Sequence, residues 1–375
     1  MRRKILIITK HLRVGGTEKM LLRILKQWLS LNYEIDIVLL YNSVTLRDDV
    51  LMRCHITSIF PEKSPQAKQL VKSDPGSIYR SKIHKLYDIE IAFQEGLPTK
   101  LVANSPNRLS YKIAWVHTNF LQYHFSASAY NSLEEEAKIY KKYNKVVFCS
   151  SSAQTAWNYV LLMPDVSEEV IYSPLDSDSP SRIRQEDPLL PPTFLTLSRL
   201  SPQKGLIRLL EASALLKQRT TKYRVLIVGD GELYHELTAQ ANTLGLEKNV
   251  VFSPATQHPF TYLTKCIAYI NTSYTESFGL SMQASLYAEV PVIAMDTLGA
   301  GGVLKNGRFG CIIPQDPEKL CDAMERVLID STYLKSLCSK ATRGHRFWIN
   351  QSIQSRTQLH DLLTRSADQS NNSYP

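Results

Sequence analysis

The chain lacks any apolar run near the roughly 18 residues that a membrane-spanning helix requires. Its six cysteines are scattered, without CxxC pairs or metal-ligand spacing, so we expect reduced, mostly buried thiols of a cytoplasmic protein. No helix-turn-helix, zinc-finger or aromatic-basic pattern occurs, which argues against a nucleic-acid partner. The opening letters MRRKILIITK hold only a short apolar run and no small-residue cleavage site, which predicts a first buried strand and not a signal peptide.

What the chain has instead is length and an uneven charge. Its 375 residues suit two domains better than one. Of its 44 Lys and Arg and 35 Asp and Glu, residues 1–175 hold 23 and 16, a balance of +7, and the remaining 21 and 19 give +2. A basic N-terminal half indicates an anionic partner such as a phospholipid surface or a phosphorylated substrate, although a solvated surface without a partner stays open.

Short apolar segments alternate with amphipathic ones along the whole chain. KILIITK, EIDIVLLY, LYDIEIAF, YKIAWVH and NKVVFCSS read as strands, and GGTEKMLLRILKQWLSL reads as a helix with one apolar face. The pattern restarts after a polar, proline-rich stretch with TFLTLSRL, YRVLIVGDG, NVVFSPA, IAYINTS and PVIAMDT as strands. Strand-helix alternation predicts parallel sheets covered on both faces. We therefore expect an α/β protein of two doubly wound, Rossmann-like domains that face a central cleft.

These segments define the domain boundaries that we expect. An N-terminal domain covers residues 1–178, a linker 179–192 and a second domain 193–345. A helix over 346–366 is expected to cross back to the first domain, and a polar tail over 367–375 to be disordered.

Several motifs fall at the predicted strand ends, where such folds bind ligands. Gly15 and Gly16 follow the first strand and open a helix, whose N–H groups favour an anion. Arg199 and Lys204 flank a turn in SRLSPQKG, which suits a diphosphate, although a solvated turn stays possible. VGDGEL contains Gly229 but fails GxGxxG, which disfavours a nicotinamide dinucleotide.

The ordered set of motifs resembles the retaining GT-B glycosyltransferases of the large bacterial group 1 family (family four), in the surface-polysaccharide subtype. The matching stretches of the second half are LSRLSPQKG, VLIVGDGEL, NVVFSPATQHPFTYL, TESFGLSMQASLYAEVPVIAMDT and LKNGRFGCIIP. The first half matches a looser pattern in KILIITKHLRVGGTEKMLLRIL, IAFQEGLPTKLV, IAWVHTNF, VVFCSSSAQ and VIYSPLD. The resemblance extends over about residues 3–365.

The resemblance implies a role for each matching residue. It makes Arg199 and Lys204 the pair that neutralises the nucleotide-sugar diphosphate, and Glu276 the carboxylate that contacts the transferred sugar. It makes His117 a histidine beside that sugar, although a lone histidine at a strand end is also commonly structural. The residues that it places near the phosphates are Gly15, Gly16, Gly229, Phe278, Gly279 and Leu280. Glu95 is a weaker candidate for the acceptor side, and we interpret Glu18 as a helix N-terminal charge.

One family position is not matched. The resemblance implies a second glutamate eight residues after Glu276, where it binds the ribose of the nucleotide, but this chain has Ala284. Gln283 and Ser285 project about 100° to either side on a helix, so neither replaces the glutamate cleanly. We expect weakened or altered nucleotide recognition. The alternative is a non-catalytic, glycosyltransferase-like binding subunit with a degenerate ribose site.

The function implied is a retaining hexosyltransferase that moves a hexose or N-acetylhexosamine from a nucleotide sugar, with UDP as the expected nucleotide. The resemblance implies a metal-independent reaction without a cofactor; DSDSP at 176–180 contains an Asp-x-Asp but lies in the linker. The expected acceptor is a lipopolysaccharide, capsule or other lipid-linked glycan. The basic first half, with YRSKIHKLY, suggests a peripheral position on the anionic inner face of the membrane. Another GT-B enzyme, such as a nucleotide-sugar epimerase, would need further acids and histidines that we do not find.

Overall fold

A computed structural model describes residues 3–13, 15–162, 165–175 and 189–371, with backbone alone for 365–371. The chain forms two compact units. The first consists of Met1–Pro174 with Ser352–Pro375, and the second of Leu175–Gln351. The predicted linker lies outside the described residues up to residue 188, as does DSDSP at 176–180. Within the described residues, no helix has both the length and the apolar character needed to cross a bilayer.

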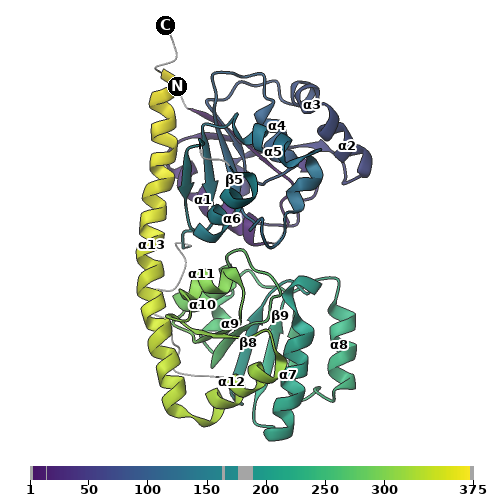
Figure 1. Ribbon diagram of the computed structural model, residues 1–375, viewed down its shortest axis with the longest axis vertical. Helices are drawn as coiled ribbons and strands as arrows, with labels where there is room; N and C mark the ends of the chain where they lie inside the picture. The colour runs from purple at the N-terminus through teal and green to yellow at the C-terminus, as the bar shows by residue number, and fades with distance from the viewer. Residues whose placement is uncertain (1–2, 14, 163–164, 176–188, 372–375) are drawn as a thin grey trace. The chain divides into compact units, whose positions relative to one another are not determined.

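The first unit is built on a seven-stranded parallel sheet with helices on its two faces (Figure 1). Its strands lie in the order β3-β2-β1-β4-β5-β6-β7. Their bounds are β1 Lys4–Thr9, β2 Glu34–Tyr41, β3 His55–Phe60, β4 Ile89–Ala92, β5 Tyr111–Val116, β6 Lys145–Phe148 and β7 Glu168–Val170. The helices are α1 Gly16–Ser30, α2 Pro65–Ser73, α3 Pro75–Lys82, α4 Leu97–Ala103, α5 Leu133–Tyr140 and α6 Ser151–Leu161, with the short η1 Asp49–Arg53 and η2 Phe125–Ala129.

Local sequence explains these elements. The central strands β4 and β5 are buried along their whole length, as the apolar runs predict for a sheet covered on both faces. Helix α1 buries the predicted apolar face, including Leu21, Leu25 and Trp28, against the sheet. Ser64 and Ser150 cap α2 and α6 by accepting hydrogen bonds from backbone N–H groups of the first turns.

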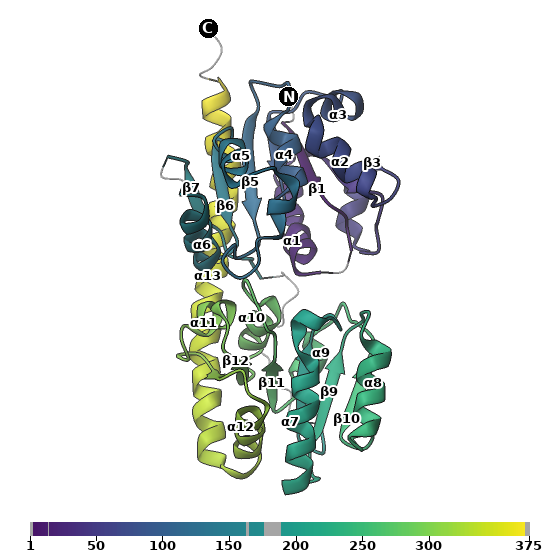
Figure 2. The ribbon, with the colours of Figure 1, turned by 45° about the vertical axis from the view of Figure 1, so that its right-hand side comes forward.

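The second unit repeats the design with six parallel strands in the order β10-β9-β8-β11-β12-β13 (Figure 2). The strands are β8 Thr193–Leu197, β9 Arg224–Val228, β10 Val250–Ser253, β11 Ala268–Asn271, β12 Val292–Met295 and β13 Cys311–Ile313. The helices are α7 Leu206–Arg219, α8 Tyr234–Thr243, α9 Phe260–Leu263, α10 Leu280–Tyr287, α11 Leu298–Leu304 and α12 Pro317–Ile329, with the short η3 Pro202–Lys204. Apolar side chains of α7, α12 and the sheet form one core.

The last helix, α13, is one continuous element from Ser331 to Asn371. It begins before the predicted start at 346, and it continues through 367–371, where we expected a disordered tail. The helix continues through Gly344. A Cβ at this position would lie only 3.0 Å from Leu286 and Phe309, so the glycine permits close packing. The later part of α13 packs within the first unit, where Trp28 Nε1 donates to the Leu359 carbonyl at 3.1 Å.

Both sheets have a point where the chain order reverses, between β1 and β4 and between β8 and β11. All the described strand pairs are parallel, so the carboxyl ends of neighbouring strands lie at one edge of each sheet. The prediction of two doubly wound, Rossmann-like domains is confirmed. Ligand sites of such folds lie at these edges, which are described next for each unit by itself.

Candidate functional site

In the second unit, the loop that follows β8 meets the loop that follows β11. Lys204 ends η3, and its Nζ lies 2.8 Å from Oε2 of Glu276. Ser273 Oγ also donates to this carboxylate, at 3.3 Å. The two side chains are 21% and 14% exposed, so the ion pair is partly screened from solvent yet remains open to a ligand. The structure thus brings together the predicted diphosphate cation and the predicted sugar carboxylate, which are 72 residues apart.

Further hydrogen bonds join the same two loops. Tyr274 N donates to the Gln203 carbonyl at 2.9 Å, and Gln203 Nε2 donates to the Thr275 carbonyl at 3.2 Å. Thr272 Oγ1 donates to the Lys204 carbonyl at 2.9 Å. These bonds hold Lys204 and Glu276 on a preorganised frame. Arg199, at the start of the first loop, is exposed, and no ion pair involves it in the described part of the chain.

Arg208 supports this frame. The sequence analysis did not single out this residue. It lies on α7, is 6% exposed, and donates to the Thr272 carbonyl and to Gln315 Oε1, the latter at 3.0 Å. Its guanidinium stacks on the Tyr274 ring, with 3.8 Å from Cζ to the ring centroid. Burial lowers the pKa of Arg208. The only sequence signal was a basic residue on the apolar face of LIRLLEASALL.

The turn after Glu276 begins α10. Gly279 has φ of +87°, and a Cβ there would lie 2.2 Å from Met282 Cε, so the position requires glycine. Phe278 is buried and packs edge-on against Trp348, with 5.4 Å between ring centroids. Leu280 is the first residue of the helix. The phosphate contacts predicted for these three residues stay predictions, whereas their placement at a helix N-terminus is observed.

Gly229 follows β9 and lies against the loop that follows β8. A Cβ at Gly229 would stand 1.8 Å from the Ser198 carbonyl oxygen, and one at Gly231 would stand 2.3 Å from that of Leu200. These glycines therefore let two loops of the site approach each other. Close loop packing is reason enough for glycine at 229, and phosphate binding there stays a prediction.

Ala284 lies on α10, and its side chain is half-buried. Gln283 and Ser285 on either side are 1% and 0% exposed, and Ser285 Oγ donates to the Ser281 carbonyl at 2.8 Å. Neither side chain therefore presents a polar group at the surface where Ala284 lies. This packing agrees with the expectation that neither Gln283 nor Ser285 replaces a carboxylate at position 284.

In the first unit, the carboxyl ends of β1, β4 and β5 carry the remaining candidates. Gly15 is the N-cap of α1 with an extended backbone, and Gly16 is the first residue of the helix. Glu18, in the first turn, is 5% exposed, and its Oε1 lies 3.3 Å from His11 Nδ1. Gln94 Nε2 donates to the same oxygen at 3.5 Å. Glu18 is thus more than a helix N-terminal charge, because it also contacts the ends of β1 and β4.

His117 follows β5 and is 9% exposed. Its ring packs against Phe93 and Trp115, and burial lowers its pKa, so the imidazole is neutral near pH 7. Glu95 is 1% exposed; it accepts a hydrogen bond from the Thr118 hydroxyl and one from His117 N at 3.4 Å. The structure therefore places Glu95 and His117 side by side. Both were singled out from sequence, whereas His11, Lys10 and Gln94 around them were not.

No group of three or more His, Cys, Asp or Glu side chains in the described residues is arranged to hold a metal ion.

The comparisons with known proteins agree with this architecture. Residues 181–344 match the family "Glycosyl transferases group 1". A Campylobacter jejuni N-acetylgalactosaminyltransferase that acts on a diacetylbacillosaminyl-diphospho-undecaprenol is 29% identical over 183 residues, which cover 48% of this chain and 49% of the relative. A Bacillus subtilis poly(glycerol-phosphate) alpha-glucosyltransferase is 29% identical over 174 residues, or 43% of this chain and 26% of the relative. The chain thus spans about half or less of these curated relatives.

Solved structures match over nearly the whole chain. Anabaena Alr3699/HepE in complex with UDP and glucose superposes with a TM-score of 0.76 at 18% identity and covers 97% of this chain and 100% of its own. The apo lipopolysaccharide outer core galactosyltransferase WaaB gives a TM-score of 0.64 at 16% identity, with 94% and 99% covered. At these identities the likeness shows the fold, and it confirms the GT-B prediction.

Proposed function

We propose that the chain is a group 1 glycosyltransferase and acts as a retaining, nucleotide-sugar-dependent hexosyltransferase, which the family match over residues 181–344 and the shared GT-B fold support. The observation that carries the proposal is the 2.8 Å approach of Lys204 to Glu276. Lys204 is the cation that a leaving diphosphate needs, and the Glu276 carboxylate accepts hydrogen bonds from sugar hydroxyl groups. Their loops are held together by hydrogen bonds from backbone and side-chain donors, so the pair is in place before substrate arrives.

The chemistry follows from what this site stabilises. Breaking the bond between the sugar and the diphosphate leaves positive charge on the sugar ring and negative charge on the departing phosphate. Lys204 and Arg199 oppose that negative charge, together with the N–H groups of Phe278, Gly279 and Leu280. Glu276 orients the sugar through its hydroxyl groups, and the role that the family resemblance implies for His117, beside the transferred sugar, stays a prediction. In this proposal the acceptor hydroxyl attacks from the face that the diphosphate leaves and passes its proton to the departing phosphate, which retains the anomeric configuration.

UDP is the proposed nucleotide, supported by UDP in the structurally similar Anabaena protein. The proposed acceptor is a lipid-linked or surface glycan, such as a lipopolysaccharide or capsule precursor. It is supported by the relative that acts on a diphospho-undecaprenol glycan and by the fold shared with a lipopolysaccharide galactosyltransferase. In this proposal the first unit serves the acceptor and the second the donor.

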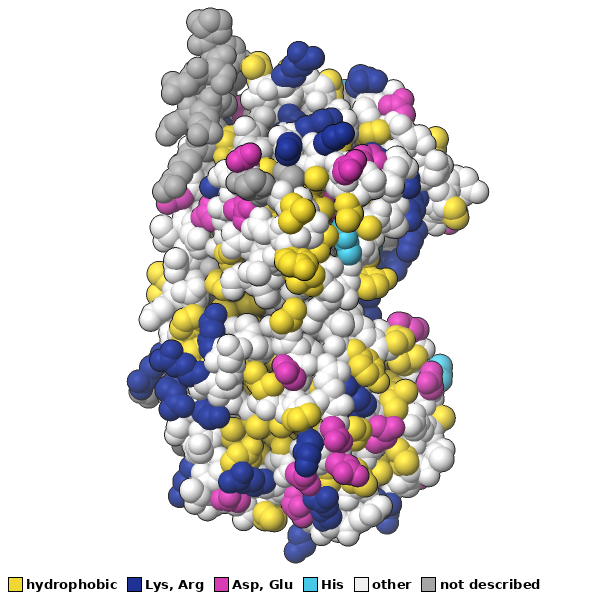
Figure 3. Space-filling view, in the orientation of Figure 1, with side chains coloured by type: hydrophobic (Ala, Val, Ile, Leu, Met, Phe, Trp, Pro, Cys, Tyr) yellow, Lys and Arg dark blue, Asp and Glu magenta, His cyan; other side chains and the backbone are white. Residues whose placement is uncertain are grey.

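A peripheral position on the anionic inner face of the membrane belongs to the same proposal. The excess of Lys and Arg over residues 1–175 supports it. Basic groups are not confined to that half, since Figure 3 shows Lys and Arg side chains gathered over the second-unit part of α13. Arg343 and Arg346 are exposed there, and Lys340 donates to the Gly310 carbonyl at 3.2 Å. Binding to such a surface would weaken as salt is added.

A second candidate function is a non-catalytic binding subunit, which the absence of a carboxylate at Ala284 favours. Calorimetric titration with UDP, GDP and ADP, followed by assay of UDP-sugar hydrolysis without acceptor, separates the two. An active transferase binds one nucleotide diphosphate and slowly hydrolyses its sugar conjugate. Nucleotide binding without any hydrolysis or transfer supports the binding subunit. If none of the three nucleotides binds, both candidate functions are wrong.

A further inference from the structure

Arg208, in the first turn of α7, is a nearly buried cation at the sheet edge where the second-unit site lies. It is 6% exposed, and none of the ion pairs in the described second unit includes it. Its Nε is buried without a hydrogen-bond partner among the described residues. A buried charge is costly unless a partner compensates it, so the hydrogen bonds that Arg208 does make need a reason.

The guanidinium of Arg208 joins several loops of the site. One terminal nitrogen donates to the Thr272 carbonyl after β11, and the other donates at 3.0 Å to Oε1 of Gln315, which follows β13. Gln315 Nε2 then donates to the Tyr274 carbonyl at 3.2 Å and to the Asp296 carbonyl at 2.7 Å. This Arg208–Gln315 link therefore ties the first turn of α7 to the loops that follow β11, β12 and β13.

Neighbouring residues leave room for the link and cover it. Gly205 has φ of +57°, and a Cβ there would lie 2.4 Å from the Thr272 carbonyl oxygen and 2.8 Å from Arg208 Nη2. The Tyr274 ring covers the guanidinium, with 3.8 Å from Cζ to the ring centroid. An aromatic face attracts a guanidinium and holds its plane. The position of Arg208 is thus fixed from the side of α7 and from the side of the loop after β11.

The segment that the link holds also carries Glu276. Thr272 and Tyr274 lie just before this carboxylate, and Ser273 between them donates to Glu276 Oε2 at 3.3 Å. Without the link, the Thr272 and Tyr274 carbonyls would lose these donors, and the backbone before Glu276 would be free to shift. A misplacement of about 1 Å can lower a reaction rate about a hundredfold.

We propose that Arg208 and Gln315 are positioning residues of the donor site, which hold the segment 272–276 so that the Glu276 carboxylate meets the transferred sugar. A guanidinium suits this role, because its N–H groups form a rigid planar fork that reaches two acceptors at once. The inference rests on the proposed transferase function and adds two residues that act through Glu276. It separates two effects: loss of the link displaces Glu276 and slows the reaction, whereas Lys204 stays in the other loop and UDP still binds.

Steady-state hydrolysis of UDP-glucose, UDP-galactose and UDP-N-acetylglucosamine by the full chain, together with calorimetric titration of UDP, tests the inference. Arg208→Met removes every donor of the guanidinium and keeps an unbranched side chain. For a conjugate that the wild type hydrolyses, kcat is expected to fall about ten- to a hundredfold, while the Kd of UDP changes less than about threefold.

Further variants distinguish positioning from a general loss of stability. Arg208→Lys keeps the charge and one donor direction, so it is expected to recover part of kcat. Gln315→Met changes an exposed residue outside the core and is expected to lower kcat severalfold. The double variant is expected to lose no more than Arg208→Met alone, because both residues act through one link.

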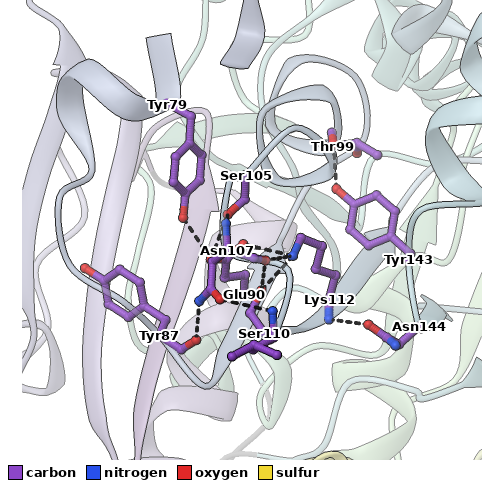
Figure 4. Close-up of polar contacts among 11 residues, drawn as sticks. Tyr79, Tyr87, Glu90, Thr99, Ser105, Asn107, Ser110, Lys112, Tyr143 and Asn144 are labelled. Atoms are coloured by element: carbon purple, nitrogen blue, oxygen red, sulfur yellow. Dashed lines mark hydrogen bonds and ion pairs between the residues drawn. The ribbon is translucent and has the colours of Figure 1, made fainter. Parts of the chain in front are cut away.

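Lys112→Met is the matched control, because Lys112 is a buried cation whose hydrogen bonds also hold a loop, at the opposite edge of the first-unit sheet (Figure 4). Lys112 is 7% exposed, donates to the Asn107 carbonyl and to Ser110 Oγ, and lies 3.7 Å from Glu90 Oε2. Its substitution leaves the Glu90 carboxylate buried without a cation, so the unfolding temperature should fall. It is expected to leave kcat and the Kd of UDP at their wild-type values.

The outcomes separate this inference from the proposed function. If Arg208→Met hydrolyses its substrate at the wild-type rate, or if Lys112→Met loses as much of kcat, the inference is wrong and the transferase proposal stands. An equal loss of kcat and UDP affinity in Arg208→Met, without recovery in Arg208→Lys, also overturns it. If Arg208→Met does not fold, Gln315→Met decides, and an unchanged kcat there overturns the inference. A wild type that hydrolyses none of the conjugates contradicts the transferase proposal itself.

Discussion

From the contact between Lys204 and Glu276 we predict that substitutions of its two partners affect UDP affinity differently. Without donor, the Lys204 ammonium is 2.8 Å from the carboxylate. When a diphosphate binds, the same ammonium must turn toward the phosphate. Lys204→Ala removes a charge-assisted hydrogen bond to phosphate, which contributes about 1.5–3 kcal/mol and so about ten- to a hundredfold in affinity for UDP. Glu276→Gln removes only the group that competes for the ammonium, so UDP should bind as well as, or better than, to the wild type.

Both substitutions should lower the catalytic rate. Glu276→Gln is expected to lower UDP-sugar hydrolysis and transfer strongly, because the sugar loses its carboxylate while the diphosphate site stays intact. Calorimetry with UDP and a hydrolysis assay measure both effects. Lys217→Ala is the control. This lysine lies in the last turn of α7, at the opposite end of the helix from Lys204, and donates to the Gly245 carbonyl at 2.5 Å. Equal UDP affinity in Lys204→Ala and wild type, or equal loss in both site variants, would refute the reasoning.

Three further predictions address the fold and the nucleotide site. Ala284→Glu should tighten UDP binding by about ten- to a hundredfold if the ribose lies over this part of α10; unchanged calorimetric affinity would show that it does not. Gly229→Ala should destabilise the protein by roughly 1–3 kcal/mol in thermal unfolding, because its Cβ would stand 1.8 Å from Ser198 O, whereas Gly302→Ala, whose Cβ meets nothing within 4 Å, should not. Burial lowers the pKa of His117 below the ordinary histidine value of about 6.5, so the unfolded chain binds a proton first and the free energy of unfolding should fall as pH drops below about 6.5. In chemical denaturation between pH 7 and 5, His117→Asn should show a shallower fall, and an equal slope would contradict the assignment.

Strand-helix alternation determined the fold class of this protein. Residues 5–8 of β1 are apolar without alternation, and β4 and β5 are buried along their whole length although each contains one charged residue, Glu90 and Lys112. Burial of this kind is what a parallel sheet covered on both faces demands. The sequence predicted that Arg199, Lys204, Glu276, Glu95 and His117 follow strand ends, and the structure has them there. Their roles in binding and catalysis stay predictions. The length of α13 was not predicted, because we expected a helix over 346–366 and a disordered polar tail, whereas the helix extends from Ser331 to Asn371 and packs closely against Leu286 and Phe309 at Gly344.

Which of these residues touch one another was decided by the tertiary structure alone. Lys204 and Glu276 are 72 residues apart, and Glu18 and Gln94 are 76 apart. Only the pairing of β8 with β11 and of β1 with β4 brings their loops to one edge. Burial is also a tertiary property: Glu18 was interpreted as a helix N-terminal charge and Arg208 was not singled out, and only the packed structure shows that both charges are buried. Sequence periodicity reports which face of an element is apolar, whereas the free energy of a buried charge depends on partners that chain folding brings from elsewhere.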